Sequence, residues 1–273
     1  MNAPLAGATL SSSILFDLYH GRALLWALTK RELQSRHAGS VAGLVWAYLQ
    51  PLLTVASYYL VFDVVFALRM GEGAPARAVG IYLIVGALPW MAFGDAVSRG
   101  TQSLVEAGGL LQKNPLPPSM FPARVVLASG LIFTPLMVGL AAAYWPVHGG
   151  AMALLALPLL WCAQVALVFW LAHLLSLFNA AVRDTGQVVT FFLQIGIFLS
   201  PALFPYAQFP ADWRWLLWIN PMTPFLLAYQ NVLLQGLWPT PEMWVAIFTW
   251  PLALAVLTRL FLNRCRDQLV DWL

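Results

Sequence analysis

The sequence predicts an all-α polytopic membrane protein with six transmembrane helices, an N-terminal interfacial amphipathic helix and short re-entrant half-helices before the last span. Only 9% of the 273 residues are charged, and 61% are apolar. Several uncharged stretches reach the ~20 residues that a helix needs to cross a bilayer. Apolar residues surround each predicted helix without a polar stripe, as in helices that contact lipid or a protein interior. Barrel strands would instead alternate at every second position over ~10 residues.

The N-terminal region is predicted to lie outside the membrane core. Residues 1–13 are small, polar and contain glycine and serine, so we expect them to be disordered. Residues 14–38 fit a helix on the membrane surface, because basic residues and a tryptophan suit the zone beside anionic headgroups. Its polar face carries Asp17, His20, Ala27, Arg31 and Gln34, and its apolar face carries Leu15, Leu18, Leu25, Trp26 and Leu28.

Residues 44–262 are predicted to form one transmembrane domain. Each span is a long stretch with few charged residues, as hydropathy requires of a helix in hydrocarbon. The six predicted spans are Leu44–Leu68, Val79–Val97, Val125–Val147, Ala151–Phe178, Val188–Phe204 and Met243–Leu262.

The distribution of basic residues predicts that both termini face the cytoplasm. Six spans place both ends on one side, and cytoplasmic loops carry an excess of Lys and Arg. Eleven basic residues fall on that side: Arg22, Lys30, Arg31, Arg36, Arg99, Lys113, Arg124, Arg183, Arg259, Arg264 and Arg266. Arg69, Arg77 and Arg214 fall on the other. Residues 263–273 are therefore expected to form a cytoplasmic tail.

Two connecting regions are distinctive. In the cytoplasmic loop 99–124, a short helix around residues 103–112 is followed by four prolines that stop it. The segment 205–242 is rich in proline and tryptophan but has no run long enough to span. We predict two half-helices within 209–235, one before Asn220-Pro221 and one after Thr223-Pro224, which dip into the outer leaflet and return.

Motifs of nucleotide and metal chemistry are missing from the sequence. There is no GxxxxGK[ST] phosphate loop and no HExxH motif. Cys162 and Cys265 give no disulfide framework, and the four histidines are scattered. We interpret His173, inside a predicted span, as a packing residue. The expectation is a chain without a metal, a cofactor, a nucleic-acid partner or catalytic activity of its own.

Charges near the spans have local explanations. Asp95 and Arg99, and likewise Glu32 and Arg36, are four residues apart, which places each pair on one helix face as an ion pair. Asp63 has no partner nearby in the sequence, so it faces either a wet pathway or the membrane surface. The Lys30–His37 cluster fits anionic lipid in general, or a phosphorylated headgroup in particular, since guanidinium groups bind phosphate with two parallel hydrogen bonds.

Aromatic residues make up 14% of the sequence and gather in the first two predicted spans. Ordinary helix packing and anchoring at the interface account for most aromatic residues in membrane proteins. The alternative is a tunnel whose flat rings stack against sugars. Its candidate lining residues are Tyr48, Tyr58, Tyr59, Phe62 and Trp90.

Four segments in order carry a family resemblance: KRELQSRHAGSVAGLVWAYLQPLL from Lys30, LLQKNPLPPSMFPAR in the long loop, VRD at 182–184, and WRWLLWINPMTPFLLAYQ before the last span. Together they resemble the membrane subunits of type-2 ABC exporters, in the branch that exports O-antigen, capsule or teichoic acid. The likeness covers about residues 20–262. The Lys113-Asn114-Pro115 run departs from it, since many relatives have a more basic or apolar run there.

The resemblance implies a permease of the bacterial inner membrane that moves lipid-linked polysaccharide. It implies pairing with a second copy of the chain and with two ATPase subunits, which bind ATP and Mg²⁺. The lipid pyrophosphate would enter at Arg22, Lys30, Arg31, Arg36 and His37. Coupling to the ATPase would involve Leu104, Glu106, Leu110, Lys113, Asn114, Arg183 and Asp184. A periplasmic gate would comprise Trp213, Trp215, Trp218, Asn220, Pro221 and Pro224.

Two other functions stay open from the sequence. A type-2 ABC permease for a drug or small lipid would share the helical bundle and the missing phosphate loop. A polytopic lipid-modifying enzyme would need clustered carboxylates or histidines for metal or acid–base chemistry, and the sparse acidic residues form no such cluster in the sequence.

Overall fold

A computed structural model describes residues 14–36, 38–70, 76, 78–114, 116–145, 152–265 and 268–272. These residues form helices joined by turns, and an isolated bridge between Arg69 and Ala78 is the one β-type pairing among them. The predicted all-α membrane protein is confirmed. The predictions for residues 1–13, His37, Arg77 and Pro115 lie outside the described residues.

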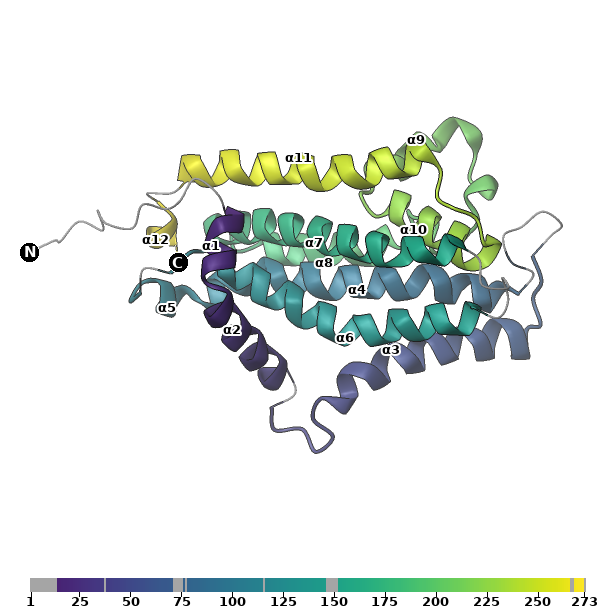
Figure 1. Cartoon of the computed structure of the whole chain (residues 1–273), viewed down its shortest axis with the longest axis horizontal. Helices are drawn as coiled ribbons and strands as arrows, with labels where there is room; N and C mark the ends of the chain where they lie inside the picture. The colour runs from purple at the N-terminus through teal and green to yellow at the C-terminus, as the bar shows by residue number, and fades with distance from the viewer. Residues whose placement is uncertain are drawn as a thin grey trace, which may run out of the picture.

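Long helices run side by side along one axis, and shorter helices occupy the two ends of the bundle (Figure 1). In chain order the helices are α1 (Ile14–His20), α2 (Arg22–Ser35), α3 (Val45–Tyr58) with its π-helical continuation η1 (Tyr59–Val65), α4 (Val79–Glu106), α5 (Gly108–Leu111), α6 (Met120–Tyr144), η2 (Met152–Leu155), α7 (Ala156–Ala181), α8 (Thr185–Gly196), η3 (Tyr206–Gln208), η4 (Ala211–Trp213), α9 (Trp215–Ile219), α10 (Thr223–Gln230), η5 (Asn231–Gln235), α11 (Pro241–Cys265) and α12 (Leu269–Trp272).

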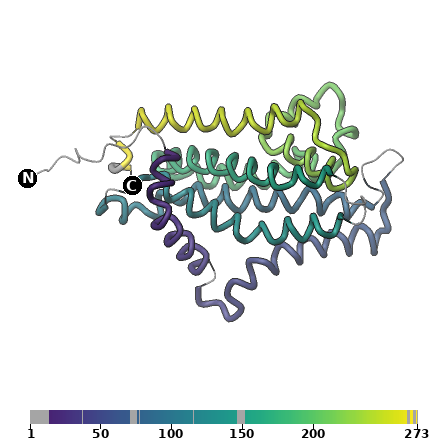
Figure 2. Tube along the Cα trace, viewed as in Figure 1, coloured from purple at the N-terminus to yellow at the C-terminus, as the bar shows by residue number. Residues whose placement is uncertain are grey.

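Helices α1, α5 and α12 lie together at one end, here called the α5 end, and α9 lies at the opposite end, here called the α9 end (Figures 1 and 2). The described part of the chain therefore begins and ends at the same end of the bundle. An even number of crossings requires this arrangement.

Five helices in the described part are long and apolar enough to cross a membrane: Val45–Val65, Val79–Glu106, Met120–Tyr144, Met152–Ala181 and Pro241–Cys265. They correspond to five of the six predicted spans. Helix α4 is longer than predicted, because it continues through Arg99 to Glu106 instead of ending at Val97. Helix α6 begins before the predicted Val125 and includes Pro122, since proline is tolerated in the first helical turn.

The predicted span Val188–Phe204 is wrong as a continuous helix, because α8 ends at Gly196 and turns follow. The segment nevertheless runs the length of α4. A Cβ placed on Gly186 would lie 3.7 Å from Nε2 of Gln102, and one placed on Gly86 would lie 2.5 Å from the carbonyl oxygen of Ala202. At 1.5 Å per residue, the stretch of α4 from Tyr82 to Gln102 is about 30 Å long, which matches the hydrocarbon thickness.

Non-helical backbone in this segment is paired inside the protein. The Tyr82 hydroxyl lies 2.7 Å from the carbonyl oxygens of both Pro201 and Phe204. The Gln230 side-chain amide donates to the Pro201 carbonyl at 2.6 Å. Without water, unpaired backbone groups in a membrane cost several kcal/mol each, so the close packing of α4 against this segment is what permits the break in α8.

Helix α4 is the centre of the core and packs against α3, α6, α7, α8 and α10. Small residues bring its neighbours close. A Cβ on Gly100 would lie 2.6 Å from that of Ala172 on α7, and one on Gly196 would lie 2.9 Å from the Trp90 ring. Helix α3 is largely exposed by contrast, with 11% of its spanning window buried.

A carboxylate caps α4 at the α9 end. The Gly80 backbone N–H donates to Asp63 Oδ1 at 2.9 Å, and the other carboxylate oxygen would lie 2.7 Å from a Cβ at Gly80. Arg69 lies 4.0 Å from Asp63. A carboxylate at a helix N-terminus accepts from an otherwise unpaired N–H and interacts favourably with the helix dipole. Asp63 thus joins α3 to α4. Its partners, the Gly80 N–H and Arg69, were not identified from the sequence.

The N-terminal helix is divided at Gly21 into α1 and α2, and α2 packs obliquely on α6 (Figure 1). Leu18, Leu25 and Leu28 of the predicted apolar face contact the core, whereas Trp26 is exposed. His173 is fully buried beside Phe169, and neither ring nitrogen has a hydrogen-bond partner among the described residues. His173 thus packs in the core, and its ring nitrogens are not satisfied there by any described residue.

The C-terminal end of α2 is fixed by a buried ion pair. Arg36, with a side chain that is 3% exposed, donates from Nη1 to Asp95 Oδ2 at 3.0 Å. Its Nη2 donates to Ser129 Oγ at 2.9 Å and to the Val125 carbonyl at 3.3 Å. Arg99 donates to the second oxygen of Asp95 at 2.9 Å, which confirms the predicted i,i+4 pair. Helices α2, α4 and α6 are thereby linked.

We predict that Gly86→Ala destabilises the fold by ~1–3 kcal/mol, because the new methyl group forces the 197–204 segment away from α4. Gly94→Ala on the same helix is the matched control, since no atom lies within 4 Å of its added Cβ, and it should be neutral or stabilising. Thermal unfolding in detergent measures both. Equal melting temperatures for the two variants would contradict the close contact.

Asp95→Asn should cost ~3 kcal/mol, because it leaves the buried Arg36 guanidinium with only the longer Glu32 contact as an anionic partner. Arg99→Gln removes the exposed partner of the same carboxylate and should cost less than ~1 kcal/mol. The same unfolding assay compares them. If Arg99→Gln lowers the stability as much as Asp95→Asn, the buried Arg36–Asp95 pair contributes no more to stability than the exposed Arg99–Asp95 pair.

Candidate functional site

The exposed face of α1 and α2 combines basic and aromatic side chains. The Arg22 guanidinium lies 5.0 Å from the centroid of the Tyr19 ring, and Lys30 Nζ lies 5.5 Å from that of Trp26. Arg31 is exposed beside them. Basic groups next to amphipathic rings suit a membrane interface with anionic headgroups. Three of the residues predicted to bind a headgroup, Arg22, Lys30 and Arg31, lie on this face.

Arg36 does not lie on this face. The sequence grouped it with Lys30 and Arg31, but its guanidinium points into the bundle and is held by Asp95 and Ser129. Arg36 therefore positions α2 and presents no open guanidinium on the exposed face. Arg36 lies two helical turns after the buried Thr29 and therefore on the same inward face of the helix. Lys30 and Arg31 lie on the exposed face.

A second charged contact joins α2 to α6 beside the first. Glu32 lies between two arginines, with Oε1 at 3.5 Å from Nε of Arg36 and Oε2 at 3.7 Å from Nε of Arg124. Both Nε–H groups are buried and lack a hydrogen-bond acceptor among the described residues. The Arg124 guanidinium also lies over the Phe121 ring at 5.2 Å. The predicted Glu32–Arg36 ion pair is confirmed, and Arg124 is a partner that sequence spacing could not reveal.

The predicted coupling segment divides into buried and exposed residues. Leu104 is fully buried with Phe121, Leu177 and Leu269, so it cannot contact another subunit directly in this conformation. The helix breaks at Ala107, and α5 follows. Residues Glu106, Leu110, Lys113 and Asn114 are exposed at this end of the bundle. Four of the five predicted residues in this loop are therefore accessible.

The 182–184 segment lies at the same end, as the resemblance implied. Arg183 and Asp184 are exposed, and Arg183 donates to the Trp272 carbonyl at 3.3 Å. The Gly186 N–H donates to the Asn179 side chain at 3.0 Å, which caps the start of α8. Leu104 of α4 and Leu177 of α7 share one apolar cluster, so this segment and the end of α4 are packed together.

The region before the last span contains the two predicted short helices, α9 and α10, which are interrupted at Asn220-Pro221. The Asn220 side chain accepts from the Met222 N–H at 3.0 Å, and Pro224 lies in the first turn of α10. Every residue of α10 is buried against the bundle. Trp213 and Trp215 are exposed, whereas the Trp218 indole donates to the Tyr206 hydroxyl at 3.1 Å.

A buried polar chain, which no sequence pattern predicted, links this region to the core. The Tyr229 hydroxyl donates to Gln164 Oε1 at 2.8 Å, and Gln164 Nε2 donates to the Pro89 carbonyl at 2.9 Å. Buried polar groups are stable only when paired, so this chain specifies how α10, α7 and α4 fit together.

The aromatic candidates for a sugar pathway do not form one surface. Trp90 is buried in the core against Phe93, so it lines no open path in the single chain. Tyr59 is exposed, and Tyr48, Tyr58 and Phe62 are partly buried along α3 and η1. The tunnel prediction is therefore corrected for Trp90.

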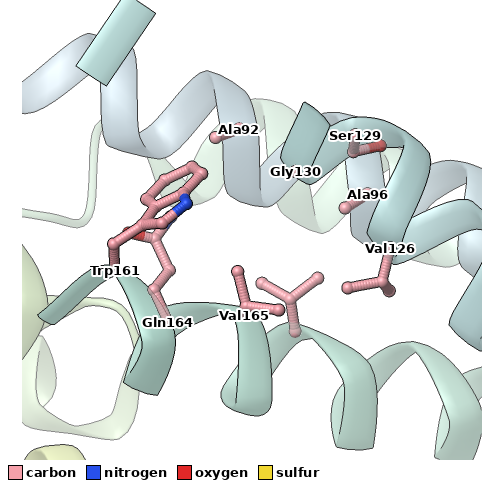
Figure 3. Close-up of a pocket in the computed structure, with 9 residues that line it drawn as sticks. Ala92, Ala96, Val126, Ser129, Gly130, Trp161, Gln164 and Val165 are labelled. Atoms are coloured by element: carbon pink, nitrogen blue, oxygen red, sulfur yellow. The ribbon is translucent and has the colours of Figure 1, made fainter. Parts of the chain in front are cut away.

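A small crevice lies between α4, α6 and α7 (Figure 3). Its walls are mostly aliphatic, with polar atoms from Ser129, Trp161 and Gln164, and those groups are paired within the protein. It is lined by Ala92, Ala96, Val126, Ser129, Gly130, Trp161, Gln164, Val165 and Val168. We see in it a packing defect beside the Arg36–Asp95 pair.

Residues 23–234 match the family model described as ABC-2 type transporter. The chain is 30% identical over 238 residues to an O-antigen export system permease protein RfbA of Myxococcus xanthus, covering 85% of this chain and 88% of that protein. It is 24% identical to RfbA of Klebsiella pneumoniae, over 81% and 82% of the two chains. It is 23% identical to the polysialic acid transport protein KpsM of Escherichia coli, over 77% and 81%. The chain belongs to the ABC-2 type transporter family and is a membrane permease.

Proposed function

We propose that this chain is the permease subunit of an ABC exporter that moves lipid-linked polysaccharide of the O-antigen or capsule type across the bacterial inner membrane. The observation that carries the proposal is the similarity to the Myxococcus xanthus O-antigen permease across most of both chains. The capsule-related polysialic acid protein supports the same substrate class. The exposed basic and aromatic face of α1 and α2 is compatible with a substrate whose anionic headgroup lies at the membrane surface.

A separate ATPase would supply the energy. The chain has no phosphate loop of its own, so two ATPase subunits would bind ATP and Mg²⁺. Exposed Leu110, Lys113 and Asn114, with Arg183 and Asp184 at the same end, would form the contact surface. The apolar cluster beneath them would transmit movement to α4, because Leu104 belongs to both.

A second copy of the chain would complete the pathway. Helix α3 exposes large apolar side chains along most of its length and has few neighbours in the bundle. Pairing through this side would bring two sets of Tyr48, Tyr58, Tyr59 and Phe62 near one another. Membrane helices associate through such packing when complementary surfaces are available.

The two ends of the bundle would have different roles. The α5 end would face the cytoplasm together with both termini, and the pyrophosphate would enter along Arg22, Lys30 and Arg31. The α9 end would face the periplasm, and α9 and α10 with Trp213, Trp215, Trp218 and Pro221 would form the gate. In this orientation the 185–204 segment makes the sixth crossing.

Deleting this chain should abolish surface polysaccharide and lead to accumulation of lipid-linked polymer inside the cell, because polymer synthesis continues without export. Immunoblots of intact and lysed cells measure both pools, and expression of the chain from a plasmid is the control. Normal surface polymer in the deletion strain would contradict the proposal. Export of a drug or a small lipid instead would support the other type-2 permease function.

Leu110→Asp should weaken co-purification of the ATPase by about tenfold, which corresponds to 1.4 kcal/mol, because a charge replaces an exposed apolar contact. Leu237→Asp is the control, since Leu237 is also exposed but follows η5, far along the chain from the coupling segment. The amount of permease in the membrane should be the same for both. Undiminished ATPase recovery with Leu110→Asp would exclude α5 from the contact.

A further inference from the structure

Glu32 lies between two arginines but forms a hydrogen bond with the Nε–H group of neither. Its carboxylate oxygens lie 3.5 Å from Nε of Arg36 and 3.7 Å from Nε of Arg124. Charge-assisted N–H···O bonds are normally about 2.7–2.9 Å long. The two Nε–H groups are buried and have no acceptor among the described residues. Leaving a buried donor without an acceptor is unfavourable, and more so when the donor is charged.

The surrounding charges balance only while Glu32 is in place. Three arginines, Arg36, Arg99 and Arg124, face Asp95 and Glu32 directly. Glu106 interacts with Glu32, Arg99 and Arg124 through space. Three positive and three negative groups therefore meet where α2 crosses α4 and α6. Without Glu32 the cluster has one excess positive charge and two buried donors that face a common space.

We infer that Glu32 occupies the place of a substrate phosphate, and that a pyrophosphate oxygen displaces it from Arg124 and Arg36 during loading. The inference rests on the proposed function and assigns its headgroup site. A tetrahedral phosphate offers more oxygens than a carboxylate, so it can accept from both Nε–H groups at hydrogen-bond distance. The Asp95–Arg36 pair stays intact, because it uses the other guanidinium nitrogens.

The location suits a lipid-borne anion. Glu32 and Arg124 are 12% and 15% exposed, so they lie just below the surface. Lys30 and Arg31 are exposed on the neighbouring turn of α2. They can attract a headgroup from the interface. The headgroup then binds Arg36 and Arg124 when it displaces Glu32. Export would then require a ligand that outcompetes an internal carboxylate, which excludes singly charged lipid headgroups.

The test measures binding of farnesyl pyrophosphate to the purified full chain in detergent by titration calorimetry. Glu32→Gln should bind it about tenfold more tightly than the original chain, or 1.4 kcal/mol, because the competing anion is gone. Arg124→Gln should bind it about tenfold more weakly. Gln34→Ala, an exposed change on the same helix, should match the original chain. Unchanged or weaker binding by Glu32→Gln would overturn the inference, because a merely structural Glu32 cannot inhibit binding.

Two further arms identify the ligand. Farnesol should show no dependence on Glu32, and inorganic pyrophosphate should bind much more weakly than the lipid form. Pyrophosphate that binds as tightly as farnesyl pyrophosphate would assign the site to a free anion and overturn the lipid assignment. If Glu32→Gln does not fold, Glu32→Asp decides, since it preserves the charge but withdraws the carboxylate and should also tighten binding. If Glu32→Gln binds farnesyl pyrophosphate more weakly while cells carrying it still export polymer, the inference about Glu32 fails and the proposed export function stands.

Discussion

The absence of water in the hydrocarbon layer is the constraint on which this structure depends. Every backbone group that leaves a helix there must find a partner inside the protein. The chain meets this requirement around α4, where Tyr82 and Gln230 bind the carbonyls of the non-helical 197–204 segment. Glycine at position 86 allows that segment to approach. The same requirement explains why Asp63 accepts from the first turn of α4.

Most of the buried charge among the described residues is concentrated in one cluster, and Asp63 at the α9 end is separate from it. The ionic cluster lies where α2 crosses α4 and α6, next to the exposed basic face of α2. Buried ion pairs contribute little net stability, because desolvation offsets their attraction. They do fix geometry. Arg36 and Asp95 set the position of α2, and the looser Glu32 contact lies where a substrate anion would arrive. The Arg36–Asp95 pair and the Arg36–Glu32 contact thus lie side by side but use different guanidinium nitrogens.

Hydropathy predicted most of the fold because long apolar helices are specified locally. The limits of α3, α7 and α11 follow closely from it. The break in α8 could not be predicted, since residues 188–204 are as apolar as a span, and only packing against α4 reveals the turns. The two short helices before the last span could be predicted, because Asn220-Pro221 interrupts the helix wherever it is placed.

The site shows the same division. The sequence alone determined the class of protein, the basic face of α2, the local ion pairs at four-residue spacing and the absence of a phosphate loop, because these follow from composition, periodicity and motifs. The tertiary structure alone decided that Arg36 and Trp90 are buried, that Arg124 shares Glu32, and that Tyr229 and Gln164 join distant helices. Contacts between helices far apart in the chain depend on how their surfaces fit, and no local pattern encodes that fit.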